Sequence, residues 1–186
     1  MTDKQFWMKL DQLTYRKNNH SVLAEFKATL LIKQATTENL SILVPGSKGA
    51  PYRQNVGEDL VYFLCYSSRK QAQEDKDNNG MWSSYPVSKV HSEILSDPKC
   101  GGIIFNYHSD SHIMIITTDL LTTPDEELNK LIMYLESDKL LKIGRAHETE
   151  LKRRIANGEV IPEEYQKDIE EHSKLLNALD AILHPS

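Results

Sequence analysis

The sequence predicts an α/β (α+β) protein, in which a mixed sheet of four to five short strands packs with helices and a C-terminal pair of helices follows. Two observations predict this class. Apolar runs of strand length are interleaved with helical patterns up to about residue 121, and only helical patterns follow. A chain of 186 residues with 39% hydrophobic residues can also bury a core without disulfide or metal staples.

Two helices and a strand are expected at the start of the chain. Apolar residues recur at helical spacing over residues 4–14 and again after Ser21, whose hydroxyl can cap the second helix. The polar stretch 36–39 ends that helix. Residues 40–44 then form a short strand, which is closed by a proline and a glycine.

The middle of the chain predicts a buried strand and two further helices. Residues 60–66 form an almost unbroken apolar run, which is typical of a strand buried on both faces. Ser67 and Ser68 can cap a helix that runs toward Glu74. Residues 87–95 show a second helical face, which begins after a proline and ends before an Asp-Pro pair.

A β-hairpin is expected next. Residues 103–106 and 113–117 are both apolar and of strand length, and the turn-forming residues 107–111 separate them. This hairpin supplies the last two strands of the predicted sheet.

The rest of the chain is predicted to be helical. Thr123 opens a helix with a hydroxyl cap, a proline in the first turn and carboxylates at the positive end of the helix dipole. A helix through Leu151 and Ile155 ends at an Asn-Gly pair, residues 157–158, where glycine supplies a left-handed turn. A last helix continues to about Leu183.

We therefore divide the chain into an α/β domain, residues 1–139, and a helical extension, residues 140–186. The last helix carries a seam at steps of four and three residues, which is the spacing of a helix packed on another helix. The seam is shorter than three heptads, so packing within the chain is the first interpretation and a homodimer through this helix is the alternative. The seam consists of Tyr165, Ile169, His172, Leu176, Leu179 and Leu183.

Charge and apolar patterning limit the partners and the location. The net charge is −5, and an acidic surface repels phosphate backbones, so nucleic-acid binding is not expected. The first residues lack the uninterrupted apolar stretch of a signal peptide, and every apolar run is shorter than the roughly 20 residues that span a bilayer. We expect a cytoplasmic protein with no membrane partner and no cofactor.

The order of the motifs resembles the N-terminal domain of the SseB family, bacterial proteins named for an enhanced serine sensitivity phenotype. The resemblance covers roughly residues 20–121. It implies an α/β layered fold and a bacterial cytoplasmic origin, and it leaves function open because the family has no defined catalytic residues. The motifs are LSILVP at 40–45, LVYFLCYSS at 60–68, YPVS at 85–88 and GGIIFN at 101–106.

Residues 75–80 match the first half of a calcium-binding loop, in which alternating side-chain oxygens converge on the ion. The twelfth position of such a loop requires a glutamate that binds through both oxygens, and here it is Pro86. A polar turn is therefore the favoured interpretation, and calcium binding is the alternative.

His108, Asp110 and His112 cluster in the loop of the predicted hairpin. Two imidazoles and a carboxylate can form part of a zinc or iron site. These residue types are also ordinary in turns, so a turn without metal is the competing interpretation.

Nucleophile and anion sites are less favoured. Cys65 falls in the buried strand pattern, where burial makes a thiol inert, and Cys100 lies closer to a turn. Ser67 and Ser68, followed by Arg69, can bind an anion at a helix start, although capping is their simpler role.

The sequence favours binding over catalysis, because no acid, base or nucleophile set assembles in it. Exposed Trp, Tyr and Met side chains are typical anchors of protein interfaces. The leading hypothesis is a non-enzymatic protein-interaction or regulatory module with an unidentified protein partner. Its candidate partner-binding residues are Met81, Trp82 and Tyr85 in a loop, and Tyr165, Ile169, Leu176 and Leu179 in the last helix.

Two other functions remain open at this stage. One is a small metal-dependent hydrolase that uses His108, Asp110 and His112. The other is a stoichiometric inhibitor or immunity-type protein, because small acidic domains suit the blocking of basic targets.

Overall fold

The computed structural model describes residues 1–15, 22–46, 53–56, 59–75, 81–109, 112–160 and 162–185, without the side chains of residues 56, 163–166 and 168. The chain forms two compact units, Met1–Leu128 and Asn129–Ser186. We call them the α/β unit and the hairpin unit. The helix that joins them runs through the boundary predicted between residues 139 and 140.

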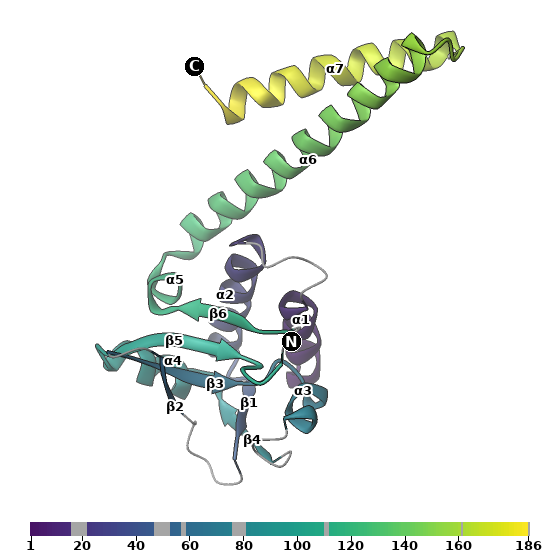
Figure 1. Cartoon of the computed structure of the whole chain (residues 1–186). Coiled ribbons are helices and arrows are strands. Elements are labelled where there is room, and N and C mark those ends of the chain that lie inside the picture. Colours follow the sequence, from purple (N-terminus) through teal and green to yellow (C-terminus); the bar gives the residue numbers. More distant parts are fainter. Residues whose placement is uncertain are drawn as a thin grey trace. The chain divides into compact units, whose positions relative to one another are not determined.

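The α/β unit contains a four-stranded and a two-stranded sheet (Figure 1). In the larger sheet the order is β2-β3-β5-β6, with β3 and β5 parallel and the outer pairs antiparallel. In the smaller sheet β1 pairs antiparallel with β4, and a bridge between Leu43 and Tyr66 connects β1 to the end of β3. The strands are β1 (Ser41–Pro45), β2 (Arg53–Val56), β3 (Leu60–Cys65), β4 (Trp82–Pro86), β5 (Cys100–Phe105) and β6 (Met114–Thr117).

Five helices of the α/β unit accompany these sheets. Local chemistry determines where some of them begin: Thr2 and Gln5 form a reciprocal capping box on α1, and the Ser68 side chain caps α3. The capping role expected for Ser68 is thus confirmed. The helices are α1 (Asp3–Thr14), α2 (Val22–Thr37), α3 (Arg69–Glu74), α4 (Val87–Ser96) and α5 (Thr118–Thr122).

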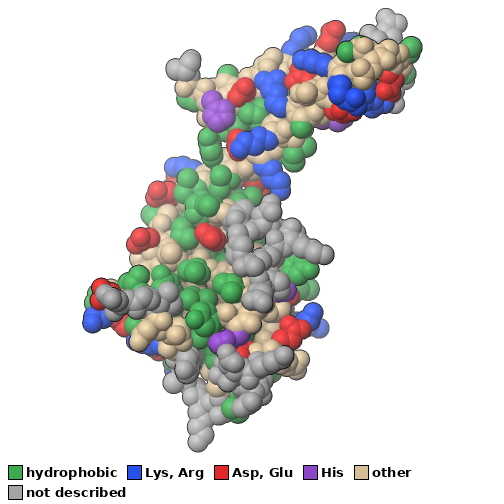
Figure 2. Space-filling model, in the orientation of Figure 1, with side chains coloured by type: hydrophobic (Ala, Val, Ile, Leu, Met, Phe, Trp, Pro, Cys, Tyr) green, Lys and Arg blue, Asp and Glu red, His purple; other side chains and the backbone are tan. Residues whose placement is uncertain are grey.

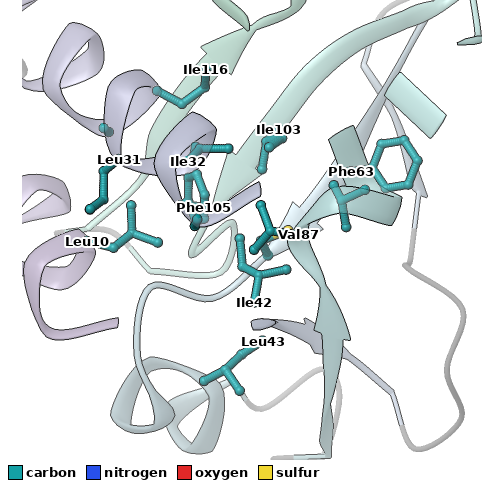
Figure 3. Close-up of a cluster of buried hydrophobic side chains, with 14 of the residues drawn as sticks. Leu10, Leu31, Ile32, Ile42, Leu43, Phe63, Val87, Ile103, Phe105 and Ile116 are labelled. Atoms are coloured by element: carbon teal, nitrogen blue, oxygen red, sulfur yellow. The ribbon is translucent and has the colours of Figure 1, made fainter. Parts of the chain in front are cut away.

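One hydrophobic core holds the helices and both sheets together. Alternate residues of β5 and β6, among them Ile103, Phe105 and Ile116, enter this core, as expected for strands that bury one face against helices. Figure 3 shows Leu10 of α1 and Ile32 of α2 on the same cluster. The predicted α+β fold class is therefore confirmed.

The structure corrects the prediction at two strands. Residues 81–85 were expected in a polar loop, but Trp82–Pro86 is strand β4, because its backbone pairs with β1 and its aromatic side chains suit a pleated, half-buried surface. Strand β2 was not predicted, because three of its four residues are polar and its pairing with β3 makes them a strand.

The hairpin unit consists of the rest of α6 (Asp125–Ala156) and α7 (Glu163–Leu183). The helices predicted to begin near Thr123 and to end near residue 157 are one helix of 32 residues. Gly144 lies at the contact between α6 and α7, where an added Cβ would come within 2.5 Å of a Leu176 methyl group. The glycine therefore lets the helices approach closely. Charged side chains of both signs cover the hairpin near the α6–α7 connection (Figure 2).

A buried carboxylate ties the two helices of the hairpin unit together. Glu148 of α6 accepts hydrogen bonds from Lys152 (2.8 Å), from Ser173 of α7 (2.7 Å) and from Arg145 (3.0 Å). Arg145 also donates to Asn177 of α7 (2.7 Å). The bond from Lys152, then those from Ser173 and Arg145, lower the pKa of Glu148 from 4.5 to about 2.

We expect the contribution of Glu148 to the stability of the hairpin unit to depend on pH. Because the pKa is lowered in the folded state, the ionised form stabilises the fold at pH values above about 4.5. This contribution should disappear as the pH falls from about 4.5 to about 2. Melting followed by circular dichroism should show a difference between the wild type and Glu148→Gln that narrows over this window. A difference that stays constant to pH 2 would contradict the assignment.

Among the described helices, none combines the length and the apolar character that a membrane span requires.

Candidate functional site

The parallel strands β3 and β5 end side by side, and the residues that follow them form a polar centre. Ligands in α/β sheets commonly bind at such carboxyl ends. Ser67 follows β3 and Asn106 follows β5, and both side chains are buried.

Asn106 is the central residue of this polar group. Its backbone has a φ of +54°, a left-handed conformation that asparagine tolerates better than most residues. Its side-chain oxygen accepts a bond from the Ser67 backbone (2.9 Å), and its nitrogen donates to the Ser67 hydroxyl (2.8 Å) and to the His112 carbonyl (3.1 Å). The Ser67 hydroxyl in turn donates to Asp11 of α1 (2.8 Å). Asn106 thus joins both strand ends, α1 and the start of β6.

A small pocket of about 100 Å³ lies beside this centre. Asp75 is 4% exposed there and accepts a 2.5 Å hydrogen bond from the Tyr66 hydroxyl, and His108 Nε2 lies 4.0 Å from its carboxylate. The volume holds about three water molecules. It therefore suits ordered water better than an organic substrate. The pocket is lined by Tyr66, Gln71, Glu74, Asp75, Asn106, His108 and Ser109.

The two histidines of the predicted metal site make different contacts. His108 lines the pocket next to Asp75, whereas the ring of His112 packs on Tyr15 at 4.7 Å between centroids. Asp110 lies outside the described residues. Within the described ranges no group of three or more His, Cys, Asp or Glu side chains gathers around one point. The metal site stays a prediction.

The predicted calcium loop falls mostly outside the described residues, since only Asp75 of residues 75–80 is placed. The pattern suggested Asp75 as the first ligand, and its carboxylate instead contacts Tyr66. Calcium binding therefore also stays a prediction.

Both cysteines are buried and unpaired. Burial raises the pKa of the Cys65 thiol and of the Cys100 thiol, so both stay protonated at neutral pH. Cys100, which the sequence favoured as the more reactive of the two, is a residue of β5 and only 5% exposed.

A larger groove of about 590 Å³ opens between α1 and α3. It holds three basic side chains, those of Lys4, Arg69 and Lys70, and one acidic side chain, that of Asp11. Trp7 supplies an aromatic wall. The lining residues are Lys4, Trp7, Met8, Asp11, Gln12, Ser68, Arg69 and Lys70. We call this the basic groove.

Arg69 is held between two tryptophans at the basic groove. Its guanidinium carbon lies 5.2 Å from the ring centroid of Trp7 and 5.5 Å from that of Trp82. Both distances are within the range of cation–π attraction. The Trp7 indole N–H donates to the Ser41 carbonyl (2.7 Å), which fixes one of the two rings.

The partner-binding residues predicted in the 81–85 segment lie in and beside β4. Trp82 is half-buried under Arg69, and Met81 is 48% exposed. The Tyr85 hydroxyl donates to Glu93 (2.9 Å), so this side chain has a structural partner within the chain. Of this set, Trp82 therefore contacts Arg69 of the basic groove without lining the groove itself.

Of the partner-binding residues predicted in the last helix, Leu176 contacts α6. Leu176 is buried at Gly144, and Ile169 and Leu179 are half-buried, whereas the side chain of Tyr165 lies outside the described residues. Among the described side chains, Leu176 of the seam is therefore used within the hairpin unit.

The contribution of α1 to the basic groove is not predicted by the sequence pattern. Trp7 and Lys4 were assigned only to an amphipathic helix, and Arg69 was considered only for anion binding at the start of α3. The available signal was the exposed basic pair Arg69 and Lys70 beside a predicted helix cap. Nothing local to the sequence brings that pair to Trp7.

Comparisons of the chain with protein-family models, with curated proteins and with solved structures give no match. The fold and the site by themselves define an α+β protein with a groove that combines aromatic and basic side chains, followed by a helical hairpin.

Proposed function

We propose that this protein is a non-enzymatic interaction module that binds an acidic, partly apolar segment of a partner protein in the basic groove. One observation carries the proposal: the guanidinium of Arg69 lies between two tryptophan rings, in a groove that has two further basic side chains. The whole chain has a net charge of −5, so this local excess of basic residues departs from the rest of the molecule.

The geometry suits a carboxylate ligand for two reasons. Arg69 is an exposed residue, and the planar set of N–H donors of its guanidinium can bind a carboxylate through two parallel hydrogen bonds. Stacking on Trp7 and Trp82 also restricts the side chain before a ligand arrives, which lowers the entropy lost on binding.

The same groove can also bind an apolar side chain. Met8 is 56% exposed in its wall, and methionine adapts to apolar ligands of different shapes. A segment with acidic residues around a leucine or phenylalanine would contact both Met8 and the basic side chains. We therefore expect a mixed acidic and apolar motif.

The proposal includes membership in the SseB family and a bacterial cytoplasmic location. The α/β arrangement of residues 40–121 agrees with the fold that the resemblance implies. The two unpaired cysteines are typical of a reducing compartment.

A labelled peptide that alternates glutamate and leucine is the direct probe, and fluorescence anisotropy measures its binding. We expect the wild type to bind it and Arg69→Ala to bind it at least about tenfold more weakly, because hydrogen bonds to charged groups contribute about 1.5–3 kcal/mol and 1.4 kcal/mol is tenfold in affinity. Arg69→Lys should be intermediate, since it keeps the charge and loses the planar donor set. Added salt should weaken binding.

Lys99→Ala is the matched control, because Lys99 is an exposed basic residue outside the groove. It should bind the peptide as the wild type does. Equal affinity for a peptide with lysine in place of glutamate, or wild-type affinity of Arg69→Ala, would refute the proposal. The native partner is then the protein that immobilised wild type and Lys99→Ala retain from a bacterial lysate and that Arg69→Ala loses.

A further inference from the structure

The hairpin unit has one polar and one apolar side. On α7 the seam residue Leu176 points at α6. Ser173 and Asp180 lie on one side of the seam and make the contacts to Glu148 and Arg145. Leu175 and Ile182 each precede a seam residue and therefore lie on the other side.

On α6, too, the side away from Glu148 and Arg145 is apolar. Leu140 and Ile143 each precede a residue of α6 that is turned inward, namely the buried Leu141 and Gly144 at the α7 contact. They therefore lie on the same side of the hairpin as the exposed leucine and isoleucine of α7. All four large side chains of this side are 57–75% exposed. We call them the apolar face: Leu140, Ile143, Leu175 and Ile182.

The register of the hairpin makes this face continuous across both helices. Arg145 contacts Asn177, and Asp138 lies 3.9 Å from His184, so the helices run antiparallel. The same register brings Leu140 to the level of Ile182. The apolar face is therefore one surface of two helices, rather than two separate stripes.

The hairpin unit buries little apolar surface of its own. Among its described residues the buried large apolar side chains are those of Ile132, Leu141 and Leu176. Two helices that share one narrow seam are only marginally stable without further packing, and oligomerisation is one way in which so small a unit can gain that packing.

We infer that the apolar face packs on the same face of a second copy of the chain, so that two hairpins form a four-helix bundle about a twofold axis. The homodimer proposed from the sequence used the seam of the last helix; in this dimer the seam stays inside each hairpin and the opposite copy covers Leu140, Ile143, Leu175 and Ile182.

The size of this side of the hairpin fits this occupant. The 21 residues of α7 extend about 31 Å, and two helices are about 20 Å wide, so the whole side measures roughly 600 Å² per copy. The apolar face, which spans residues 175–182 of α7, is the apolar part of that area, and the exposed charged residues beside it belong to its polar rim. Stable interfaces bury about 800 Å² of solvent-accessible surface per partner. Accessible surface follows the contours of the side chains, so it is larger than a flat footprint of the same extent. Two hairpins therefore offer an area of the order that a dimer requires.

The charges around the face are also self-complementary. Lys139 and Glu136 of α6 and Lys174 and Glu171 of α7 are exposed next to it. Each helix thus presents both signs, and a twofold axis can pair the basic residues of one copy with the acidic residues of the other. A partner of one strong charge would meet repulsion from half of these residues.

Sedimentation equilibrium of the full chain over a wide range of concentrations tests the inference. We expect the wild type to approach the mass of a dimer as the concentration rises. Leu175→Glu should weaken the dimer at least about tenfold, because it places a charge without a partner in an apolar contact. Ile182→Ser, a milder change, should weaken it in the same direction.

Val160→Glu is the control, because Val160 is 91% exposed and lies outside the apolar face. It makes a comparable apolar-to-acidic change and should leave the dimer intact. Circular dichroism shows whether each variant keeps its helices. If Leu175→Glu loses them, the dimer affinity of Ile182→Ser tests the inference instead. A wild type that is monomeric at every concentration, or a dimer unaffected by both variants, would overturn the inference.

Discussion

Gly102→Ala is expected to lower the unfolding free energy of the α/β unit by about 3–4 kcal/mol, which is a large fraction of the stability of an ordinary domain. Gly102 has a φ of +133°, a conformation that residues with a side chain rarely adopt. An added Cβ would overlap the backbone carbonyl oxygen of Ile116 and lie 2.9 Å from the Cα of Thr117. Backbone atoms cannot rotate away, so β5 and β6 would have to separate.

Urea denaturation followed by tryptophan fluorescence measures this loss. Both tryptophans of the chain, Trp7 and Trp82, belong to the α/β unit, so the signal reports that unit and not the hairpin unit. The midpoint of unfolding should move to a lower urea concentration in Gly102→Ala.

Gly101→Ala is the matched control, because it adds the same methyl group one residue earlier in β5. The methyl would overlap the far end of the Tyr62 ring, which can move aside. We expect a loss of about 1 kcal/mol or less. Equal losses in Gly101→Ala and Gly102→Ala would show that neither the positive φ nor the approach of β6 constrains this position.

The second large effect is expected for Asn106→Ala, with a loss of about 3 kcal/mol in the unfolding free energy of the α/β unit. The left-handed backbone conformation of Asn106 costs alanine about 1 kcal/mol of conformational free energy. It also removes the bonds to the Ser67 backbone and to the His112 carbonyl, and a buried group without its partner costs about 1–3 kcal/mol.

Asn106→Gly separates the two contributions. Glycine adopts a positive φ without strain but lacks the side chain, so this variant should be about 1 kcal/mol more stable than Asn106→Ala and still less stable than the wild type. The same urea titration compares them. If Asn106→Gly unfolds at the wild-type urea concentration, the side-chain bonds of Asn106 do not hold the strand ends together.

Most of the strands could be predicted because their signals are local. The apolar runs over residues 40–44 and 60–66 and the hairpin of 103–106 with 113–117 correspond to β1, β3, β5 and β6. β-branched and aromatic residues favour extended backbone in any context that buries them. Strand β2 could not be predicted, because its sequence is mostly polar and its neighbour β3 supplies the hydrogen bonds to its backbone.

The polar centre and the basic groove could be predicted only in part. The sequence located Ser67 and Ser68 after a buried strand and noted the basic residue Arg69. It did not indicate that Asn106 would bond to Ser67, because these residues are 39 positions apart. The pairing depends on the parallel register of β3 and β5.

The sequence by itself determined the α+β class, most of the strand and helix positions, and the burial of Cys65, because apolar periodicity and capping chemistry act within a few residues. Only the tertiary structure brought Trp7, Arg69 and Trp82 together and separated the polar from the apolar side of the hairpin. Both features arise between segments that are distant in the chain. Their geometry depends on strand pairing and helix packing, and no local pattern of residues encodes it.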